Sequence, residues 1–197
     1  SYVNTSVGVK ALTDICCTSS NAVEIVRSLP VNAKIVFAPD RNLGNYIQSV
    51  TGRDMVVWDG ACHVHEEFSL EKIIELKKQY PEAKVLAHPE CKKPVLLVAD
   101  YVGSTAALLN YATQSDADTF IVVTEPGILH QDNPSKRFIP APPSDSTCGC
   151  NDCSYMKLVT LDKMYAALRD ETPEVVIEES IRRRAERSIR NMLRAKR

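Results

Sequence analysis

An internal repeat with a spacing of 85 to 91 residues is the feature that most constrains the fold of this chain. The matching segments keep their order along the sequence, as copies of one structural unit do. They are Asp14 with Asp100, 17–19 with 103–105, 34–40 with 119–125, Cys62 with Cys153, and 69–76 with the segment that begins at Thr160. The repeat therefore predicts two related units in a chain of 197 residues.

Each copy shows the same series of elements. An extended start and a short apolar strand lead into a Ser/Thr junction, an amphipathic helix and a second apolar strand that ends in an acid, Asp40 or Glu125. Strands that alternate with helices form parallel βαβ units. We therefore predict an α/β fold with two pseudo-symmetric three-layer αβα domains and parallel sheets. Their predicted ranges are 1–67 and 68–159, with a helical tail at 160–197.

The two Ser/Thr junctions, at 18–21 and 103–105, lie where a strand is expected to meet a helix. Ser, Thr and Asn side chains often cap the free N–H groups of a first helical turn. The same N–H groups and hydroxyls can instead bind an anion, and ligands of open α/β sheets lie at this end of the strands. Both interpretations stand for each junction, and their repetition favours a shared anionic ligand.

The composition is that of an ordinary globular protein, with 44% hydrophobic residues, 25% charged residues and a net charge of −1. This balance gives no overall attraction to nucleic acid, and no apolar run approaches the roughly 20 residues that span a bilayer. The Arg-rich tail places Ile181, Ala185, Ile189 and 192–193 on one helical stripe. Because Glu178, Glu179 and Glu186 each precede an Arg by four residues, we interpret this tail as a packing helix rather than a nucleic-acid surface.

Seven cysteines, an odd number without a secretion signal, argue against a disulfide framework and favour metal ligands or buried thiols. Three of them, Cys148, Cys150 and Cys153, lie close together, and thiolates bind zinc or iron–sulfur clusters. The repeat pairs Cys62 with Cys153. Two equivalent thiolates from two equivalent domains predict a pseudo-symmetric metal site that needs a third ligand.

Other candidate side chains lie in two short segments. In 61–67, Cys62 is followed closely by His63, His65 and Glu66. In 87–91, His88 and Glu90 alternate at the end of an expected strand, so both side chains point the same way. An imidazole and a carboxylate placed in this manner predict acid–base chemistry, and a surface pair is the alternative.

Six segments resemble, in order, the motifs of the bacterial quinolinate synthase family. They are 2–26, 37–47, 62–65, 87–91, 99–108 and 153–164. The resemblance implies three related α/β domains around a pseudo-threefold axis, each giving one cysteine to a 4Fe-4S cluster with one iron open to substrate. It also implies a cytoplasmic enzyme of NAD biosynthesis. Its reaction would condense iminoaspartate with dihydroxyacetone phosphate to quinolinate, with loss of phosphate and water.

Carried over residue by residue, the resemblance implies that Cys62 and Cys153 are two of three cluster ligands and that the third lies outside this chain. His88 and Glu90 match the acid–base pair of the family, and Tyr2 matches a further proton donor. The residues that match substrate-binding positions are Tyr2, Asn4, Ser19, His65, His88, Glu90, Ser104 and Thr105. The tail at 160–197 is expected to pack on a first domain that this sequence does not contain.

The implied partners are the two small-molecule substrates, an L-aspartate oxidase as source of iminoaspartate, and a first domain or second chain that completes the enzyme. Neither nucleic acid nor a membrane is expected. Two other functions stay open from the residues alone. One is a zinc-binding structural or interaction module that uses Cys148, Cys150, Cys153 and a histidine. The other is a non-catalytic α/β protein that binds anions.

Overall fold

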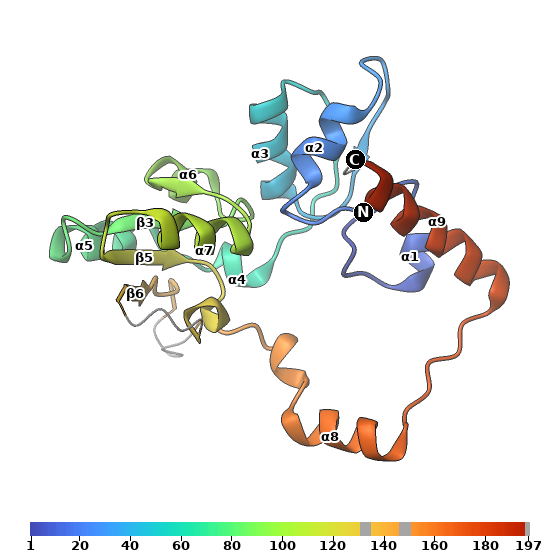
Figure 1. Ribbon diagram of the computed structural model, residues 1–197. Helices are drawn as coiled ribbons and strands as arrows, with labels where there is room; N and C mark the ends of the chain where they lie inside the picture. The colour runs from blue at the N-terminus through green and yellow to red at the C-terminus, as the bar shows by residue number, and fades with distance from the viewer. Residues whose placement is uncertain (131–134, 146–150, 196–197) are drawn as a thin grey trace.

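The computed structural model describes residues 1–130, 135–145 and 151–195, and its architecture is α/β with parallel sheets, as the sequence predicts. The first repeat contains a two-stranded parallel sheet, β1–β2, and an isolated parallel bridge between Tyr2 and Cys17. Its elements are α1 (Val7–Ala11), α2 (Ala22–Ser28), β1 (Val36–Phe37), α3 (Arg41–Thr51), β2 (Val56–Val57) and α4 (His63–Glu66). Figure 1 shows them from blue to cyan.

The second repeat contains a four-stranded sheet in the order β4-β3-β5-β6, in which every pair is parallel. Its elements are α5 (Leu70–Gln79), β3 (Lys84–Ala87), α6 (Lys93–Leu97), β4 (Tyr101–Val102), α7 (Thr105–Gln114), β5 (Thr119–Val123), η1 (Pro126–His130) and β6 (Arg137–Pro140). The strands β3 and β5 are almost wholly buried, as expected for a parallel sheet with helices on both faces.

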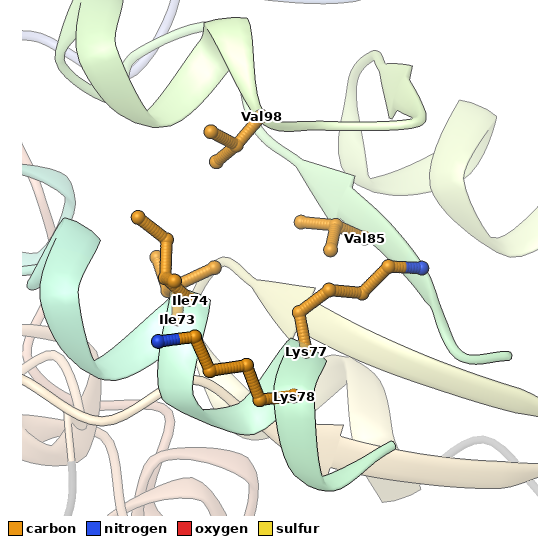
Figure 2. A pocket seen from close by; sticks show the side chains of 6 residues that line it. All are labelled: Ile73, Ile74, Lys77, Lys78, Val85 and Val98. Carbon is orange, nitrogen blue, oxygen red and sulfur yellow. The ribbon is translucent and has the colours of Figure 1, made fainter. Parts of the chain in front are cut away.

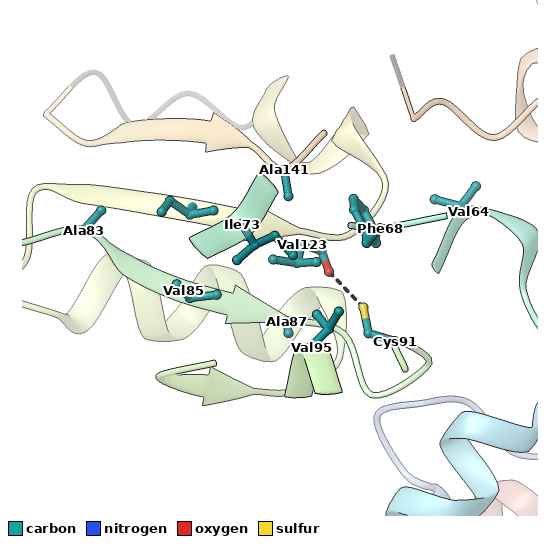
Figure 3. Packing of buried hydrophobic residues seen from close by; sticks show 11 residues of the cluster. Val64, Phe68, Ile73, Ala83, Val85, Ala87, Cys91, Val95, Val123 and Ala141 are labelled. Atoms are coloured by element: carbon teal, nitrogen blue, oxygen red, sulfur yellow. Dashed lines mark hydrogen bonds between the residues drawn. The ribbon is translucent and has the colours of Figure 1, made fainter. Parts of the chain in front are cut away.

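Two apolar cores cover the two faces of this sheet and give it three layers. On one face, Ile73 of α5 and Val95 of α6 pack with Val85, Ile121 and Val123 of the strands. Figure 3 shows this core, including the hydrogen bond from the Cys91 thiol to the carbonyl of Val123 at 3.4 Å. On the other face, Leu108 and Ala112 of α7 pack with Leu86, Phe120 and Val122.

Equivalent backbone contacts recur in the two repeats. In the first, the N–H of Cys17 donates to the carbonyl of Ser1 at 2.9 Å. In the second, the N–H of Gly103, the match of Cys17, donates to the carbonyl of Ala87 at 3.1 Å. These contacts fit the predicted repeat, while the domain limits at 67 and 159 stay a prediction.

The tail contains η2 (Met156–Leu158), α8 (Leu161–Asp170) and α9 (Glu179–Ala195). Helix α9 lies alongside α1 and also contacts α2 (Figure 1). Ala185 and Ser188 are its buried residues, whereas Leu193 is 60% exposed. The predicted stripe thus packs within this chain at Ala185, while Leu193 at its other end is left exposed. Among the described residues the partner of α9 is the first repeat, and packing of the tail on a further domain stays a prediction.

The ion pairs predicted along α9 are confirmed at Glu179 with Arg183 and at Glu186 with Arg190. The pair predicted at Glu178 is wrong, because this carboxylate precedes the helix and accepts hydrogen bonds from the N–H groups of Ser180 and Ile181. In the part of the chain that the structure describes, no helix is both long and apolar enough to cross a membrane.

Candidate active site and metal centre

The candidate site forms where both repeats present the carboxyl ends of their strands. Cys62 directly precedes α4, and His65 lies within this helix. His88 and Glu90 lie in the turn that follows β3. Oxygen, nitrogen or sulfur atoms of Cys62, His65 and Glu90 all lie within 4.8 Å of one another. The structure thus joins residues from the two segments, 61–67 and 87–91, that the sequence analysis selected.

Asp40 fixes the backbone at Cys62. Its side chain is almost fully buried, and Oδ2 accepts a hydrogen bond from the N–H of Cys62 at 2.8 Å. Its Oδ1 accepts a second one from the N–H of Leu43 at 2.8 Å and so caps α3. Burial raises the pKa of Asp40, despite the opposing effect of these N–H groups.

His65 lies at the centre of the cluster and is buried. Its Nε2 is 3.1 Å from Oγ1 of Thr124, and its Nδ1 is 3.2 Å from Oε2 of Glu90. Although this buried Nδ1 lies close to Glu90 and Cys62, the geometry of these contacts is not that of a hydrogen bond. Among the described residues, Nδ1 therefore lacks a hydrogen-bond partner. Burial lowers the pKa of His65, but the contacts with Cys62 and Glu90 outweigh it and raise the pKa to about 9.

His88 stacks on His65, with ring centroids 4.5 Å apart and an interplanar angle of 23°. Its Nδ1 accepts a hydrogen bond from the backbone N–H of Glu90 at 3.3 Å. Burial, together with the positive charge of His65, lowers the pKa of His88 to about 4. The neutral ring must then carry its proton on Nε2, which makes that nitrogen a hydrogen-bond donor.

Glu90 is held at several points. Burial acts to raise its pKa, but the hydrogen-bond contact with His65 and the positive charge of that ring outweigh burial and lower it. Asn42, from α3 of the first repeat, donates from Nδ2 to the carbonyl of Glu90 at 3.0 Å and to Oε1 of Glu66 at 2.5 Å. Asn42 therefore links the first repeat to the loop that carries the buried carboxylate.

Tyr2 and Ser19 form a second part of the site. The backbone N–H of Ser19 donates to the phenol oxygen of Tyr2 at 3.3 Å. Burial raises the pKa of Tyr2, and the charge of Glu90 acts in the same direction. Asn21, not Ser19, lies at the start of α2, and its Oδ1 accepts from the N–H of Thr18 at 2.7 Å. The Ser19 hydroxyl is therefore not needed as a helix cap.

The second junction differs from the first. Ser104 is the N-cap of α7, and its hydroxyl accepts from the N–H of Ala107 at 3.4 Å. Thr105 and Asn4 are exposed. In residues 1–130, 135–145 and 151–195, no hydrogen bond joins these three candidates to His65 or Glu90. The structure supports the capping interpretation at Ser104 and leaves a role in ligand binding as a prediction.

Cys153 lies on a segment that contacts α4. Nδ2 of Asn151 donates to the carbonyl of Val64 at 2.8 Å, and the ring of Tyr155 meets the ring of His63 at 5.4 Å. The carbonyls of Cys62 and Cys153 each accept from the N–H four residues later, at 3.0 and 3.1 Å. The two thiols that the repeat pairs thus begin similar helical turns. Cys148 and Cys150 lie outside the described residues.

Sequence reasoning did not select Asn42 or Thr124. Asn42 is separated from its partners Glu66 and Glu90 by at least 24 residues, and Thr124 is 59 residues from His65. A polar residue directly after the apolar strand 119–123 was the only local signal for Thr124. Asp40 did carry a signal, because it ends the apolar segment 34–40 and matches Glu125 in the repeat.

A separate pocket of about 220 Å³ lies between α5 and β3 (Figure 2). It is lined by Ile73, Ile74, Lys77, Lys78, Val85 and Val98. Figure 2 shows Lys77 extending along its rim, where its ammonium donates to the carbonyl of Ala83 at 2.5 Å. The apolar lining lacks acid–base groups other than these lysines, so this pocket does not belong to the candidate site.

The fold and the cluster define a parallel α/β protein with a half-buried thiol and a buried imidazole and carboxylate at the carboxyl ends of its strands. Residues 1–194 match the family model described as quinolinate synthetase A protein, and the chain belongs to that family. Relatives named quinolinate synthase are 57% identical in Thermosynechococcus vestitus, 57% in Microcystis aeruginosa and 50% in Chloroherpeton thalassium. Each match covers 98% of this chain, which spans only about 61% of the length of these relatives.

Proposed function

We propose that this chain is part of a quinolinate synthase, which condenses iminoaspartate with dihydroxyacetone phosphate to quinolinate. One phosphate and two waters leave, and no net oxidation occurs. The observation that carries the proposal is the meeting of Cys62, His65 and Glu90 within 4.8 Å, in a chain that matches the family over residues 1–194. An L-aspartate oxidase is the proposed source of the unstable iminoaspartate.

A 4Fe-4S cluster is the proposed cofactor, with Cys62 and Cys153 as two of its ligands. Two observations support the fit: both thiols are free, and the segments that carry them are in contact. The third thiolate is expected from outside this chain, from a further domain or a second chain. When bound, such a cluster supplies an iron that can act as a Lewis acid on a substrate oxygen.

The remaining chemistry falls to side chains of this chain. Glu90, with its lowered pKa, is ionised at neutral pH and can accept a proton during enolisation. His65, with a pKa of about 9, is positively charged and can balance a substrate carboxylate. His88 is neutral, and its Nε2–H can donate a hydrogen bond to a substrate oxygen.

Tyr2 completes the proposed proton-transfer set. Its raised pKa keeps the phenol protonated at neutral pH, so it can donate to an oxygen that develops negative charge. Ser19, whose N–H binds the Tyr2 oxygen, has a hydroxyl that can donate to a carboxylate or phosphate. We also propose Asn4, Ser104 and Thr105 as substrate-binding residues, on the family resemblance alone.

The test is an anaerobic assay of quinolinate formation and of iron and zinc content in the complete enzyme that contains this chain. Cys62→Ala and Cys153→Ala should each lose the cluster and activity, whereas Cys148→Ala and Cys150→Ala should keep most of both. Zinc in place of iron, lost when Cys148 or Cys150 is replaced, would support the zinc-binding module instead. An intact cluster without quinolinate formation would refute the proposed reaction.

A further inference from the structure

Thr124 is a buried hydroxyl residue directly after β5, with 4% of its surface exposed. Four of the five residues of the preceding strand are buried and apolar. A hydroxyl buried there has to find a polar partner, because an unpaired one costs about 1–3 kcal/mol. Its Oγ1 lies 3.1 Å from Nε2 of His65, and both side chains are buried.

Of the described contacts on the other sides of the ring, only the ion-pair contact of Nδ1 with Glu90 bears on which way the ring faces. Nδ1 faces Oε2 of Glu90 at 3.2 Å but lacks an aligned hydrogen bond among the described residues. The ring stacks on His88 at 4.5 Å and meets Phe68 at 6.1 Å. Stacking constrains the plane of an imidazole, but it does not distinguish the ring from one flipped by 180°, in which carbons replace the two nitrogens.

The hydrogen bond to Thr124 does distinguish the two orientations, because a flipped ring would present a carbon to the hydroxyl. We propose that Thr124 is a positioning residue that holds His65 with Nδ1 directed at Glu90 and Cys62. Its influence on catalysis rests on the proposed function, but the orientation of the ring does not. The hydroxyl acts through His65, because among the described residues its hydrogen-bond partner is that ring and not the thiol or the carboxylate.

The first experiment observes the imidazole directly. The chain has only four histidines, so ¹⁵N-labelled histidine gives a simple side-chain NMR spectrum at pH 7. We expect one slowly exchanging Nε2–H signal that disappears in His65→Gln. Thr124→Val, which keeps the shape and removes the hydroxyl, should shift or lose this signal, and Thr124→Ser should restore it.

A matched control is Thr113→Val, because the hydroxyl of Thr113 is exposed and, within the described part of the chain, donates only to the backbone carbonyl of Leu109 at 2.9 Å. This variant should leave the His65 signal unchanged. The proposal is overturned if Thr124→Val has the signal of the unchanged protein. If that variant fails to fold, the spectrum of the protein without substitutions still tests the proposal. The absence of a protected His65 Nε2–H signal from that spectrum would refute the hydrogen bond.

The second experiment measures quinolinate formation in the complete enzyme. Thr124→Val should lower kcat/KM by about tenfold, as loss of a hydrogen-bond partner that orients a functional imidazole commonly does, while Thr124→Ser stays within about twofold. The iron content should be the same in both variants. An unchanged enzyme that forms no quinolinate would refute the proposed function, whereas an active Thr124→Val enzyme would refute only the positioning role.

Discussion

Replacement of Asp40 gives the most direct test of how the site is held, because this one carboxylate joins two segments. One oxygen caps α3 through the N–H of Leu43, and the other accepts the N–H of Cys62, both at 2.8 Å. Asp40→Ala removes both acceptors at once. Asp40→Asn keeps the shape and one acceptor, but its amide group must direct an N–H toward the second donor.

The size of the effect follows from these two hydrogen bonds. Loss of the N-cap costs about 1 kcal/mol, and a buried N–H of Cys62 without a partner costs about 1–3 kcal/mol. Burial raises the pKa of Asp40, which means that the ionised carboxylate is itself partly destabilised by its surroundings. For this reason we adopt the lower half of the summed free energy. Asp40→Ala should therefore destabilise the fold by about 2–3 kcal/mol, and Asp40→Asn by less.

The assay is thermal unfolding followed by circular dichroism, with iron retention measured in parallel. For a chain of this size, the predicted loss corresponds to a fall in Tm of about 4–12 °C. Asp59→Ala is a suitable control, because the side chain of Asp59 is 88% exposed and its one ion-pair partner among the described residues is Arg41. If Asp40→Ala and Asp59→Ala unfold at the same temperature, the structural role assigned to Asp40 is incorrect.

Three further predictions concern the site itself. In the complete enzyme, Glu90→Gln should keep the cluster and bind substrate but lose turnover by at least about a hundredfold, and near-normal kcat would remove Glu90 from the mechanism. Ser19→Ala should weaken substrate binding by about 1–3 kcal/mol, measured as KM, and an unchanged KM would exclude contact of the hydroxyl with substrate. Because the pKa of His88 falls from 6.5 to about 4 on folding, the unfolded chain binds the proton first as the pH falls. Stability measured by urea midpoints should therefore decrease from pH 6.5 to 4, and this decrease should be smaller in His88→Gln. The pKa of His65 rises to about 9 instead. The folding stability that protonated His65 contributes should therefore be complete below pH 6.5 and be lost between pH 6.5 and 9.

The positions of the main elements could be predicted from the sequence because they depend on local patterns. The apolar run at 119–123 became β5, and Ser69 and Thr160 cap the helices that follow them. The start of α2 was less predictable, because four consecutive polar residues at 18–21 can each act as a cap. The choice of Asn21 leaves Ser19 free to approach Tyr2, a contact that links residues 17 positions apart.

From the sequence, the candidate site was predictable only for residues whose type by itself indicates acid–base or metal-binding chemistry. Histidines and acids next to a cysteine indicate a site by their type alone, and His65, His88 and Glu90 do meet. Asn42 and Thr124 are ordinary polar residues, and only the three-dimensional contact gives them a role. The charges of the two histidines could not be predicted from the sequence either. His65 and His88 stack on each other, yet their pKa values are shifted in opposite directions.

The repeat also shows which surfaces of the chain lack a partner. Val36 of β1 matches Ile121 of β5 in the repeat, but Val36 is 72% exposed whereas Ile121 is fully buried beside α5. A groove of about 410 Å³, lined in part by Val36, opens at this uncovered position.

Conversely, α8 follows the second repeat as α5 follows the first, and no residue of α8 is buried. Its Leu161 and Leu168 are more than 80% exposed. The chain therefore presents a sheet face without its helix and a helix without its sheet. One further copy of the same unit would fill both places, with its sheet beneath α8 and its last helix over β1. This is the physical basis on which we propose that a third α/β domain packs against these two surfaces.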